Sequence, residues 1–303
     1  MRVAVITPVS GRHQHLRRQR RGLLAGTRGP DLHVVIAMDD PAIRNVLDED
    51  GSVPDLLDLQ CSRRRLPLAR ARNLGAARAL TSDADLLVFL DVDCIPGVEM
   101  LQRYVAYAEQ ETRPTLLCGP VSYLPPPPPH GYDPDQLTAI GRPHPARPVP
   151  PETGAICRGD HQLFWSLSFA VRASWWRDLG GFCEEYEGYG CEDTDFGQIA
   201  VRHGVPLTWL GGAWAYHQHH DTTDPPVQHV DDILRNAAIF FRRWGWWPMR
   251  GWLDDFERRG LIRFDGETQT WMRSGAPAAR VVPAYVASAG GLPPSGVAGE
   301  SWR

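Results

Sequence analysis

The chain opens with short, fully apolar runs that alternate with stretches whose apolar residues recur at helical spacing. A run of about four to eight apolar residues between turn signals is typical of a buried strand. Such runs predict strands at 3–6, 32–38 and 86–90, the first of them stopped by Thr7-Pro8. Helices are predicted between them, at 12–24 and 66–80. This order is typical of an α/β protein with a mainly parallel, Rossmann-like sheet, flanked by helices and joined by right-handed crossovers.

The second half of the chain is less regular. Residues 163–171 and 207–216 read as strands, and 230–247 carry apolar residues at the spacing of an amphipathic helix. Prolines crowd the segment 121–162, and proline has no N–H to donate. We therefore expect an excursion without regular hydrogen-bonded structure, either ordered over a site or acting as a flexible lid. Small residues dominate 275–303, which predicts a flexible tail.

Composition removes several classes of function. The net charge of −4 indicates no nucleic-acid partner. All basic side chains are arginine, which excludes Schiff-base or phosphate-binding lysines and leaves the forked guanidinium as the fixed cation for a phosphate. The six cysteines form no CxxC pair and are expected to be reduced. No apolar stretch of about 18 residues is present, and the N-terminus reads as a strand, so we expect no transmembrane segment and a cytoplasmic location.

Polar residues follow the predicted strands at the edge where ligands bind in open α/β sheets. The acidic members of this group are Asp39, Asp40, Asp91 and Asp93, and Thr7 follows the first strand. Asp91-Val92-Asp93 would direct two carboxylates to one side of an extended segment, and such oxygen ligands suit Mg²⁺ or Mn²⁺. A solvated turn after a strand is the alternative.

Three further groups carry candidate chemistry. His217, His219 and His220 follow a predicted strand, and imidazole binds Mn²⁺ or Zn²⁺. Only one of the three need be a ligand, and strand alternation separates His219 from His220. A polar loop in which the histidines cap or stack is the alternative. Arg70, Arg72 and Asn73 near a helix start suit a diphosphate or ribose, or a solvated helix face.

Glu192-Asp193 opens an apolar run with helical spacing. Acidic residues favour a helix start, because the first amide groups are free there and the dipole is positive. The alternative is a catalytic carboxylate presented at a helix start beside a glycine-rich loop. Tryptophans such as Trp165 are core residues or stack on a sugar at the rim of a site.

Taken in order, these segments resemble a GT-A glycosyltransferase, close to family 2, with a galactosyltransferase-like C-terminal segment. The resemblance covers roughly residues 1–220. It is carried by VITPVSGR at the N-terminus, AMDD at 37–40, ARARNLGAARA at 69–79, LVFLDVDCIP at 87–96, GGFCEEYEGYGCEDTDFGQIAVRHG at 180–204 and YHQHH at 216–220.

The resemblance implies a metal-dependent transferase that moves a sugar from a nucleotide-diphosphate donor, such as a UDP-sugar, to the hydroxyl of a glycan or small molecule. It implies a nucleotide-binding half at 1–120, the excursion, an acceptor and catalytic half at 163–224, a helical extension at 225–274 and the tail. Asp193 is implied as the general base. We expect inversion of the anomeric centre, because one well-placed carboxylate suffices for it, although related folds also include retaining enzymes. The implied donor-binding residues are Thr7, Pro8, Asp39, Asp40, Arg72, Asn73, Asp91 and Asp93. The implied acceptor-binding residues are Trp165, Tyr189, Gly190 and Glu192, and the implied ligands of Mn²⁺ or Mg²⁺ are Asp91, Asp93, His217 and His219.

The loop before Glu192 departs from the family. Gly-Trp-Gly-Gly is common there, whereas this chain has Gly188-Tyr189-Gly190-Cys191. Tyr189 keeps an aromatic wall, and Cys191 narrows the turn.

Other readings share single motifs with this chain. The segment 91–95 resembles the nucleophile motif of haloacid-dehalogenase-type phosphatases, which lies on the first strand there and requires a later lysine. The segment 217–221 resembles a metallo-β-lactamase-type hydrolase, but Thr222 replaces the final histidine. A nucleotidyltransferase would need a lysine-bearing glycine-rich loop near its start. A glycan-binding module that has lost catalysis is the non-enzymatic alternative.

Overall fold

The computed structural model describes residues 1–48, 54–150 and 153–275. The chain divides into two compact units. The first contains Met1–Gly188 and Glu192–His220, and the second contains Tyr189–Cys191 and the residues from Asp221 onward. Within the described residues, no helix combines the length and the apolar content needed to cross a membrane.

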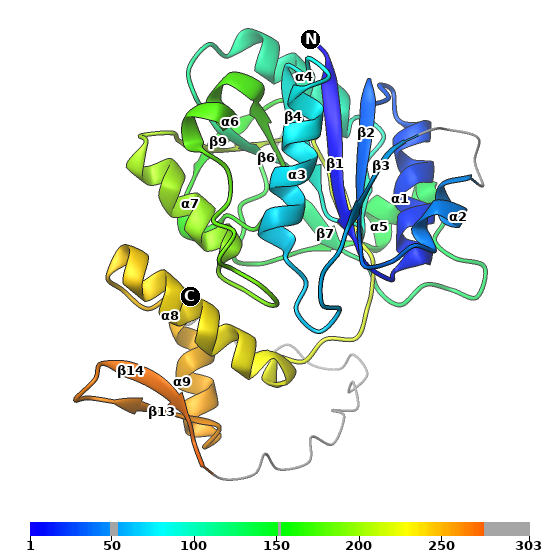
Figure 1. Ribbon diagram of the computed structural model, residues 1–303. Coiled ribbons are helices and arrows are strands. Elements are labelled where there is room, and N and C mark those ends of the chain that lie inside the picture. Colours follow the sequence, from blue (N-terminus) through cyan, green and yellow to red (C-terminus); the bar gives the residue numbers. More distant parts are fainter. Residues whose placement is uncertain (49–53, 151–152, 276–303) are drawn as a thin grey trace, which may run out of the picture. The chain divides into compact units, whose positions relative to one another are not determined.

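An eight-stranded sheet forms the centre of the first unit, in the order β3-β2-β1-β4-β10-β6-β11-β9 (Figure 1). Its first four strands run parallel to one another, whereas β10 is antiparallel to both of its neighbours. The strands are β1 Val3–Val9, β2 Leu32–Met38, β3 Asp55–Leu59, β4 Leu86–Leu90, β6 Leu116–Cys118, β9 Ile156–Gly159, β10 Ser168–Arg172 and β11 Leu207–Leu210. This is the α/β class that the alternation of strands and helices predicts, and the expected GT-A-type sheet is confirmed.

Helices cover both faces of this sheet because successive strand residues point to opposite sides. Leu87 and Phe89 of β4 pack with α3, α6 and α7, whereas Leu86, Val88 and Leu90 pack with α1 and α4. The helices of the unit are α1 His13–Ala25, α2 Ile43–Leu47, α3 Leu68–Leu80, α4 Met100–Gln110, α5 Leu137–Ile140, α6 Ala173–Leu179 and α7 Glu192–Arg202. Strands that are covered on both faces read as continuous apolar runs, which is why β2 and β4 lie at their predicted positions.

A second, four-stranded sheet has the order β5-β12-β7-β8. Its strands are β5 Cys94–Pro96, β7 Val121–Tyr123, β8 Arg142–Pro143 and β12 Ala215–His217. In the antiparallel pairing of β12 with β5, His217 lies opposite Cys94. This register brings the histidine-rich end of β12 next to Asp93, although the two are far apart in the sequence.

Three strand predictions need correction. Strand β1 does not stop at Thr7-Pro8 but continues to Val9. Its pairing with β4 ends at Ile6, so at Pro8 only β2 is a neighbour and the missing N–H is tolerated. The run 163–171 becomes a strand only at Ser168, and the run 207–216 is divided between β11 and β12, which belong to different sheets.

The proline-rich segment 121–162 was expected to lack regular structure, and this is only partly so. The prolines at 125–129 lie outside helices and strands. The segment also contributes β7 and β8 to the small sheet and β9 to the edge of the large one, and it contains helix α5. Its short elements pair with β11 and β12, partners that the local sequence does not reveal.

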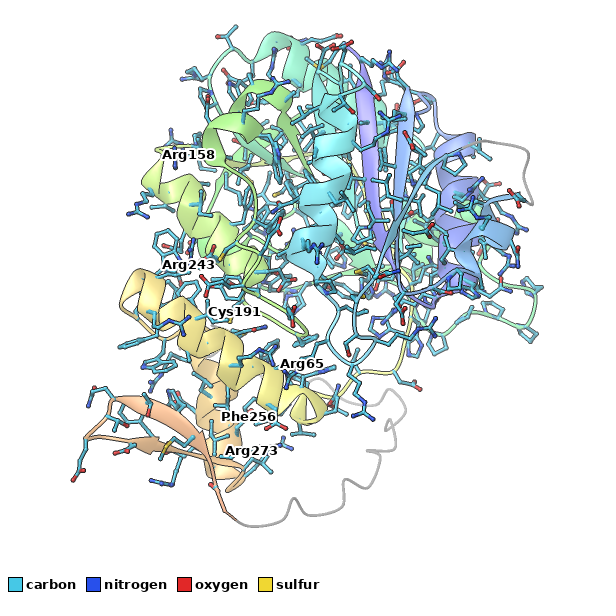
Figure 2. All side chains as sticks on the ribbon, viewed as in Figure 1. Arg65, Arg158, Cys191, Arg243, Phe256 and Arg273 are labelled. Atoms are coloured by element: carbon cyan, nitrogen blue, oxygen red, sulfur yellow. The ribbon has the colours of Figure 1, made fainter. Side chains whose placement is uncertain are left out.

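The second unit has its own apolar core. Helix α8 (Val230–Trp244) ends with Gly245 in the left-handed conformation at φ 78°, and α9 (Arg250–Arg258) follows. A hairpin of β13 (Ile262–Asp265) and β14 (Thr270–Arg273) completes the unit, so the predicted extension is not helical throughout. Phe256 of α9 is buried in this core (Figure 2). Apart from Gly275, the predicted tail lies outside the described residues.

Candidate active site

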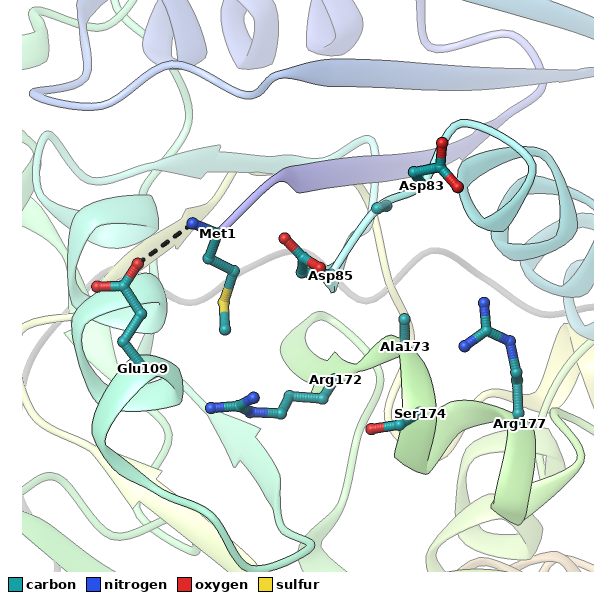
Figure 3. Close-up of a pocket in the computed structure, with 9 residues that line it drawn as sticks. Met1, Asp83, Asp85, Glu109, Arg172, Ala173, Ser174 and Arg177 are labelled. Atoms are coloured by element: carbon teal, nitrogen blue, oxygen red, sulfur yellow. Dashed lines mark hydrogen bonds and ion pairs between the residues drawn. The ribbon is translucent and has the colours of Figure 1, made fainter.

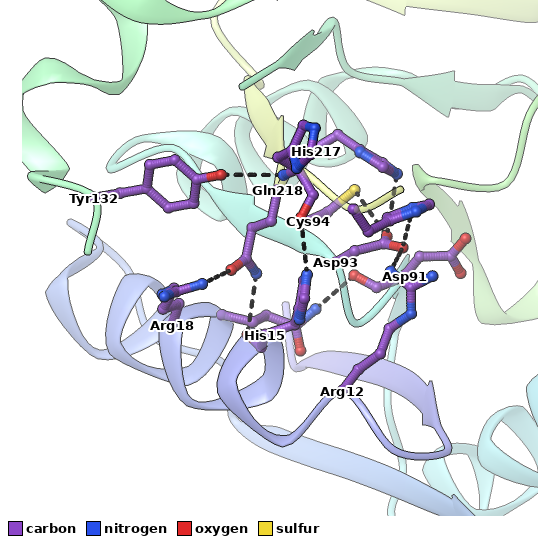
Figure 4. Close-up of polar contacts among 12 residues, drawn as sticks. Arg12, His15, Arg18, Asp91, Asp93, Cys94, Tyr132, His217 and Gln218 are labelled. Atoms are coloured by element: carbon purple, nitrogen blue, oxygen red, sulfur yellow. Dashed lines mark hydrogen bonds and ion pairs between the residues drawn. The ribbon is translucent and has the colours of Figure 1, made fainter. Parts of the chain in front are cut away.

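A candidate metal site lies where the small sheet meets the end of β4. The ligand atoms of Asp93, His217 and His220 all lie within 4.8 Å of one another. Each imidazole Nε2 is 3.6 Å from a carboxylate oxygen of Asp93. Figure 4 shows Asp93 between the end of β12 and the start of α1. A carboxylate and two imidazoles form a donor set that can hold Mn²⁺, as it can Zn²⁺ or Fe²⁺, so these residues fit the Mn²⁺ that the resemblance implies.

His220 lies in this cluster, whereas His219, the predicted ligand, does not. The backbone of His219 is engaged instead, since its N–H donates to the Tyr132 hydroxyl at 3.1 Å. Strand β12 ends at His217, and Gln218 is fully buried with its N–H donating to the Asp93 carbonyl at 2.7 Å. Side chains therefore do not alternate between two faces beyond His217, where β12 ends. The side chain of His220 consequently lies next to Asp93.

Positive charge surrounds Asp93. Arg12 donates from Nη1 to Asp93 Oδ2 at 3.1 Å. Burial alone would raise the pKa of Asp93, but His217, Arg12 and His220 together lower it below its usual range. Burial, reinforced by the charge of Arg12, lowers the pKa of His15, which is hydrogen-bonded to the His219 carbonyl. Asp93 is therefore an anion at neutral pH, as a metal ligand must be.

Asp91 does not accompany Asp93. The chain turns after β4, with the Cys94 N–H donating to the Asp91 carbonyl at 2.8 Å, so the expected extended segment with both carboxylates on one side is wrong. Asp91 accepts a hydrogen bond from Arg72 at 2.9 Å and lies outside the three-residue cluster. A turn reverses the direction of the backbone, so carboxylates two residues apart no longer point the same way.

Arg72 links the end of β4 to the start of α7. It is 1% exposed, and its two terminal nitrogens donate to Asp91 (2.9 Å) and Glu192 (3.2 Å). Burial alone would lower the pKa of Arg72, but the two carboxylates raise it. Because this guanidinium is paired on both sides, it holds the Glu192-Asp193 segment at the same sheet edge as Asp91 and Asp93.

Asp193 lies half-buried in the first turn of α7, and its Oδ1 accepts the Thr194 N–H at 2.7 Å. Burial and the neighbouring charge of Glu192 raise the pKa of Asp193 to about 7. A carboxylate with this pKa is matched to accepting a proton near neutral pH. The two interpretations of Glu192-Asp193 are therefore compatible, because Asp193 lies in the first turn of α7 and is also the candidate catalytic carboxylate.

The loop before α7 belongs to the second unit. Asn236 of α8 is fully buried and donates to the carbonyls of Tyr189 (3.2 Å) and Gly190 (2.9 Å). Gly190 has φ +91° and Cys191 has φ +77°, a left-handed conformation that costs a non-glycine residue about 1–2 kcal/mol. Cys191 was expected to narrow this turn. The positive φ angle of Cys191 shows that the backbone of the turn is strained. Tyr189 stacks on His229, with ring centroids 4.4 Å apart.

Other predicted donor-binding residues form hydrogen bonds with residues of the first unit. Thr7 and Pro8 are buried in β1, and the Thr7 hydroxyl is hydrogen-bonded to Gln19 at 3.0 Å. Burial raises the pKa of Asp40, but hydrogen bonds from His13 and the Gly11 N–H lower it below its usual value.

Asp39 and Asn73 serve local roles at the same edge. Asp39 is exposed and paired with Arg63. Asn73 donates to the Phe182 carbonyl at 2.9 Å and accepts the Phe182 N–H at 2.9 Å, which fixes the loop that leads to α7.

Sequence reasoning missed three residues of this region, Arg12, His15 and Arg147. Arg12 and His15 lie in the segment that follows β1, and the motif VITPVSGR ends at Arg12, so the nearest signal was a fixed cation directly after a strand. Arg147 carries no such signal, because it lies among the prolines of 121–162. The ring of Trp165, predicted at the acceptor, lies against Arg147 with the guanidinium carbon 5.1 Å from its centroid.

A separate cavity of about 570 Å³ opens where β1 and β4 begin (Figure 3). Its lining mixes both signs of charge, from Asp83, Asp85, Glu109, Arg172 and Arg177. In an open α/β sheet, ligands bind at the carboxyl ends of the strands, and this cavity is at the other edge. We therefore place the active site at Asp93 and Asp193 and not in this cavity.

Two validoxylamine A glucosyltransferases are similar to the chain in sequence. The protein from Streptomyces hygroscopicus subsp. limoneus is 26% identical over 275 residues, which cover 80% of this chain and 56% of the relative. The protein from Streptomyces hygroscopicus subsp. jinggangensis (strain 5008) is 26% identical over 268 residues, which cover 74% and 58%. The chain thus spans little more than half the length of these curated relatives. No family model matches it.

Solved structures of glycosyltransferase fold are similar as well. The S. aureus protein TarS (residues 1–349) in complex with UDP-GlcNAc superposes with a TM-score of 0.56 at 13% identity, covering 86% of this chain and 78% of that one. GalNAc-T7 with UDP, GalNAc and Mn²⁺ superposes with a TM-score of 0.54 at 17% identity, covering 73% and 44%. At such identities the likeness establishes the fold, which is GT-A-like.

Proposed function

We propose that this chain is a glycosyltransferase that moves a sugar from a nucleoside-diphosphate donor to an acceptor hydroxyl. The observation that carries the proposal is that two different sites lie at one sheet edge, where Arg72 pairs with Asp91, two residues before Asp93, and with Glu192, which directly precedes Asp193. One is the cluster of Asp93, His217 and His220, and the other is Asp193, a carboxylate with a pKa of about 7. A leaving diphosphate needs positive charge, and a hydroxyl nucleophile needs a proton acceptor. The GT-A-like fold and the glucosyltransferase relatives support the same conclusion.

Asp93, His217 and His220 would hold a divalent cation, Mn²⁺ or Mg²⁺. When bound, that ion supplies electrostatic stabilisation of the negative charge that develops on the departing diphosphate. We assign the metal-ligand role to His220 in preference to His219, because His220 Nε2 approaches Asp93 to 3.6 Å. Asp91 is not assigned as a metal ligand in this proposal. It accepts a hydrogen bond from Arg72 and so positions that guanidinium.

Asp193 is proposed as the general base. Its carboxylate accepts the proton of the acceptor hydroxyl while that oxygen forms a bond to the anomeric carbon of the donor sugar. The bond from the anomeric carbon to the diphosphate oxygen breaks, and the electron pair leaves with the nucleoside diphosphate. Attack from the face opposite the leaving group inverts the anomeric centre. One carboxylate suffices for this course, which is why we propose inversion.

The surrounding residues divide between donor and acceptor in this proposal. Asp39, Asp40 and Arg72 line the donor side, and the donor is a UDP-sugar, a choice supported by UDP-GlcNAc in the TarS structure and by UDP in the GalNAc-T7 structure. Glu192 orients the acceptor, with Trp165, Tyr189 and Gly190 contributing to its binding. The acceptor is a hydroxyl-bearing glycan or small molecule, and the transferred group is a hexose, as the name of the two relatives suggests. Membership of family 2 and a cytoplasmic location belong to the same proposal.

The test is the thermal stability of the purified protein with UDP, GDP, dTDP or CDP, each with and without Mn²⁺. A ligand that binds only the native state raises the melting temperature by mass action. We expect one nucleotide, UDP, to stabilise the protein in a metal-dependent manner, and Asp93→Ala to abolish the effect. A response to Zn²⁺ alone, with none to any nucleotide, would instead favour a metal-dependent hydrolase.

A second variant separates catalysis from binding. Asp193→Asn keeps the shape of the side chain and removes its basicity. Transfer from the donor should fall by about 10²–10⁴-fold, whereas stabilisation by UDP and Mn²⁺ should persist. Transfer at the wild-type rate would refute the assignment of the base, and a wild-type protein that binds nucleotide but transfers nothing would favour a non-catalytic glycan-binding role.

A further inference from the structure

Arg147 is a buried cation that has no counter-ion among the described residues. Its side chain lies inside the first unit, where the residue is 7% exposed. None of its three guanidinium nitrogens has a hydrogen-bond partner in the described part of the chain. Buried charges are ordinarily paired and hydrogen-bonded, because removing a guanidinium from water is costly. The exception at Arg147 therefore requires a physical explanation.

Two tryptophans flank the guanidinium. Its central carbon lies 4.4 Å from the ring centroid of Trp209 and 5.1 Å from that of Trp165. These cation–π contacts orient the planar group, but they satisfy none of its N–H donors. The rings thus orient a fork of buried donors that has no acceptor among the described residues.

The titratable groups near Arg147 are thiols and phenols, and they do not neutralise its positive charge. Burial lowers the pKa of Arg147, and the groups that oppose this effect are the thiols of Cys118 and Cys94 and the phenols of Tyr123 and Tyr104. Thiols and phenols that are buried keep their protons at neutral pH, and burial raises the pKa of Cys94 well above its usual value. No carboxylate among the described residues forms an ion pair with Arg147.

Arg147 lies close to the metal-ligand cluster. Its charge acts on the thiol of Cys94, the residue that follows Asp93. The ring of Tyr123, which also interacts with Arg147, lies 4.8 Å from the ring of His217. The ring of His144 lies 6.0 Å from that of Tyr123 and 4.8 Å from that of Trp165, and Trp165 lies against the guanidinium of Arg147. A continuous set of side chains therefore joins the guanidinium to the proposed metal ligands, and all of them belong to the first unit.

We propose that Arg147 is an anion-binding residue of the active site, whose N–H fork takes a phosphate or carboxylate group of the bound substrate. Because the nitrogens are covered, binding is accompanied by a shift of the half-buried pair Trp165 and His144. The fork suits two oxygens of one anion, and arginine is the only fixed cation type in this chain. This inference extends the proposed function, since it rests on that substrate being a nucleoside-diphosphate sugar. The anion comes either from the diphosphate or from an acidic group on the sugar.

The experiment compares Arg147→Met with Arg142→Met, which removes an exposed arginine of the same segment. Without ligand, Arg147→Met should have an unchanged or higher melting temperature, because it removes an unpaired buried charge at similar volume. Its affinity for UDP in the presence of Mn²⁺, measured by calorimetry, should fall by at least about tenfold, whereas the affinity for uridine stays the same. The control should change neither quantity.

Further ligands identify the source of the anion. A parallel loss of affinity for inorganic pyrophosphate assigns Arg147 to the diphosphate. Unchanged binding of UDP, with a loss confined to UDP-glucuronate and absent for UDP-glucose, assigns it to a sugar carboxylate. If the wild-type protein binds pyrophosphate through Arg147 but no nucleotide, the anion site stands and the proposed function fails.

Arg147→Lys guards against a variant that does not fold, since it keeps the charge and loses the fork. It should bind UDP less tightly than the wild type and more tightly than Arg147→Met. Full affinity of both variants for every anion would overturn the proposal. A large drop in the ligand-free melting temperature of Arg147→Met, with anion binding of Arg147→Lys unchanged, would also overturn it and would leave Arg147 as a support for Trp165 and Trp209.

Discussion

The carboxyl group of Asp193 holds its proton to a higher pH than an ordinary aspartate because it is half-buried next to Glu192. Arg72 opposes this effect, and Asp91 adds to it. A general base must be unprotonated to act, so its active fraction grows as the pH rises through the pKa and falls below it. We expect kcat/KM to decline about tenfold per pH unit below pH 7, as measured in a pH–rate profile from pH 5 to 9.

A variant of the neighbouring charge tests the cause of that shift. Glu192→Gln removes a negative charge beside Asp193, so the pKa of Asp193 should fall and the acidic limb of the profile should move to lower pH. The rate itself will also change, since Glu192 is proposed to orient the acceptor, but the position of the limb reports the pKa alone. A limb that stays in place would show that a different group titrates.

Loss of Arg72 should strongly destabilise the protein. Arg72→Met leaves Asp91 and Glu192 without their common partner, and breaking a buried ion pair in this way costs about 3–5 kcal/mol. The free energy of unfolding in urea measures it. The matched control is Arg78→Met on the same helix, whose pair with Asp55 is partly exposed and should be worth about 1 kcal/mol or less. Equal losses for the two variants would contradict the role given to Arg72.

At the scale of helices and strands, a strand could be predicted from the sequence where it was long and buried on both faces. Strands β2 and β4 are covered on both faces, so their apolar runs identified them from the sequence. Strands β5 and β12 have three residues each, too few for any periodicity, and their pairing joins segments more than a hundred residues apart. That pairing brings His217 close to Asp93, and His220 lies in the same cluster whereas His219 does not, an arrangement of tertiary contacts that the local sequence does not reveal. Arg147 was hidden for the same reason, because its neighbours Trp165 and Trp209 come from elsewhere in the chain.

Helix α8 gives the element-scale prediction. Its Asn236 donates to two carbonyls of the strained turn 189–191, and that turn leads directly into Glu192 and Asp193. Asn236→Asp replaces the donor with a charge that repels those carbonyls, so the turn should relax and kcat should fall about tenfold or more. Binding of UDP and Mn²⁺ should be unaffected, because Asp93, His217 and His220 lie in the first unit.

The control for Asn236 is Phe240→Leu on the same helix. Phe240 packs against Trp246, with ring centroids 4.6 Å apart, and its loss should destabilise the second unit without removing a hydrogen bond to the turn. Variants with equal loss of melting temperature should therefore differ in kcat. If both lose activity to the same extent, Asn236 contributes only to the stability of the unit.

At the scale of the whole molecule, the two units have separate apolar cores. The core of the second unit is formed by residues of α8, α9 and the hairpin, and those of the first unit by the large sheet and its helices. The proposed donor-binding residues all belong to the first unit, whereas Tyr189 and Gly190 belong to the second. This division predicts that the donor nucleotide stabilises one unit in preference to the other.

Hydrogen exchange with and without UDP and Mn²⁺ tests this division. At a ligand concentration 100 times Kd, a native-state ligand adds about 2.7 kcal/mol to the unfolding free energy of the part that binds it. Amides of β1, β4 and α3 that exchange by unfolding of the first unit should slow accordingly, about a hundredfold, while those of α8 and the β13–β14 hairpin should keep their rates. Asp93→Ala should abolish the difference, because it removes the metal ligand without touching the second unit. Equal slowing in both units would mean that they unfold together, and that the separate cores do not act as separate units of stability.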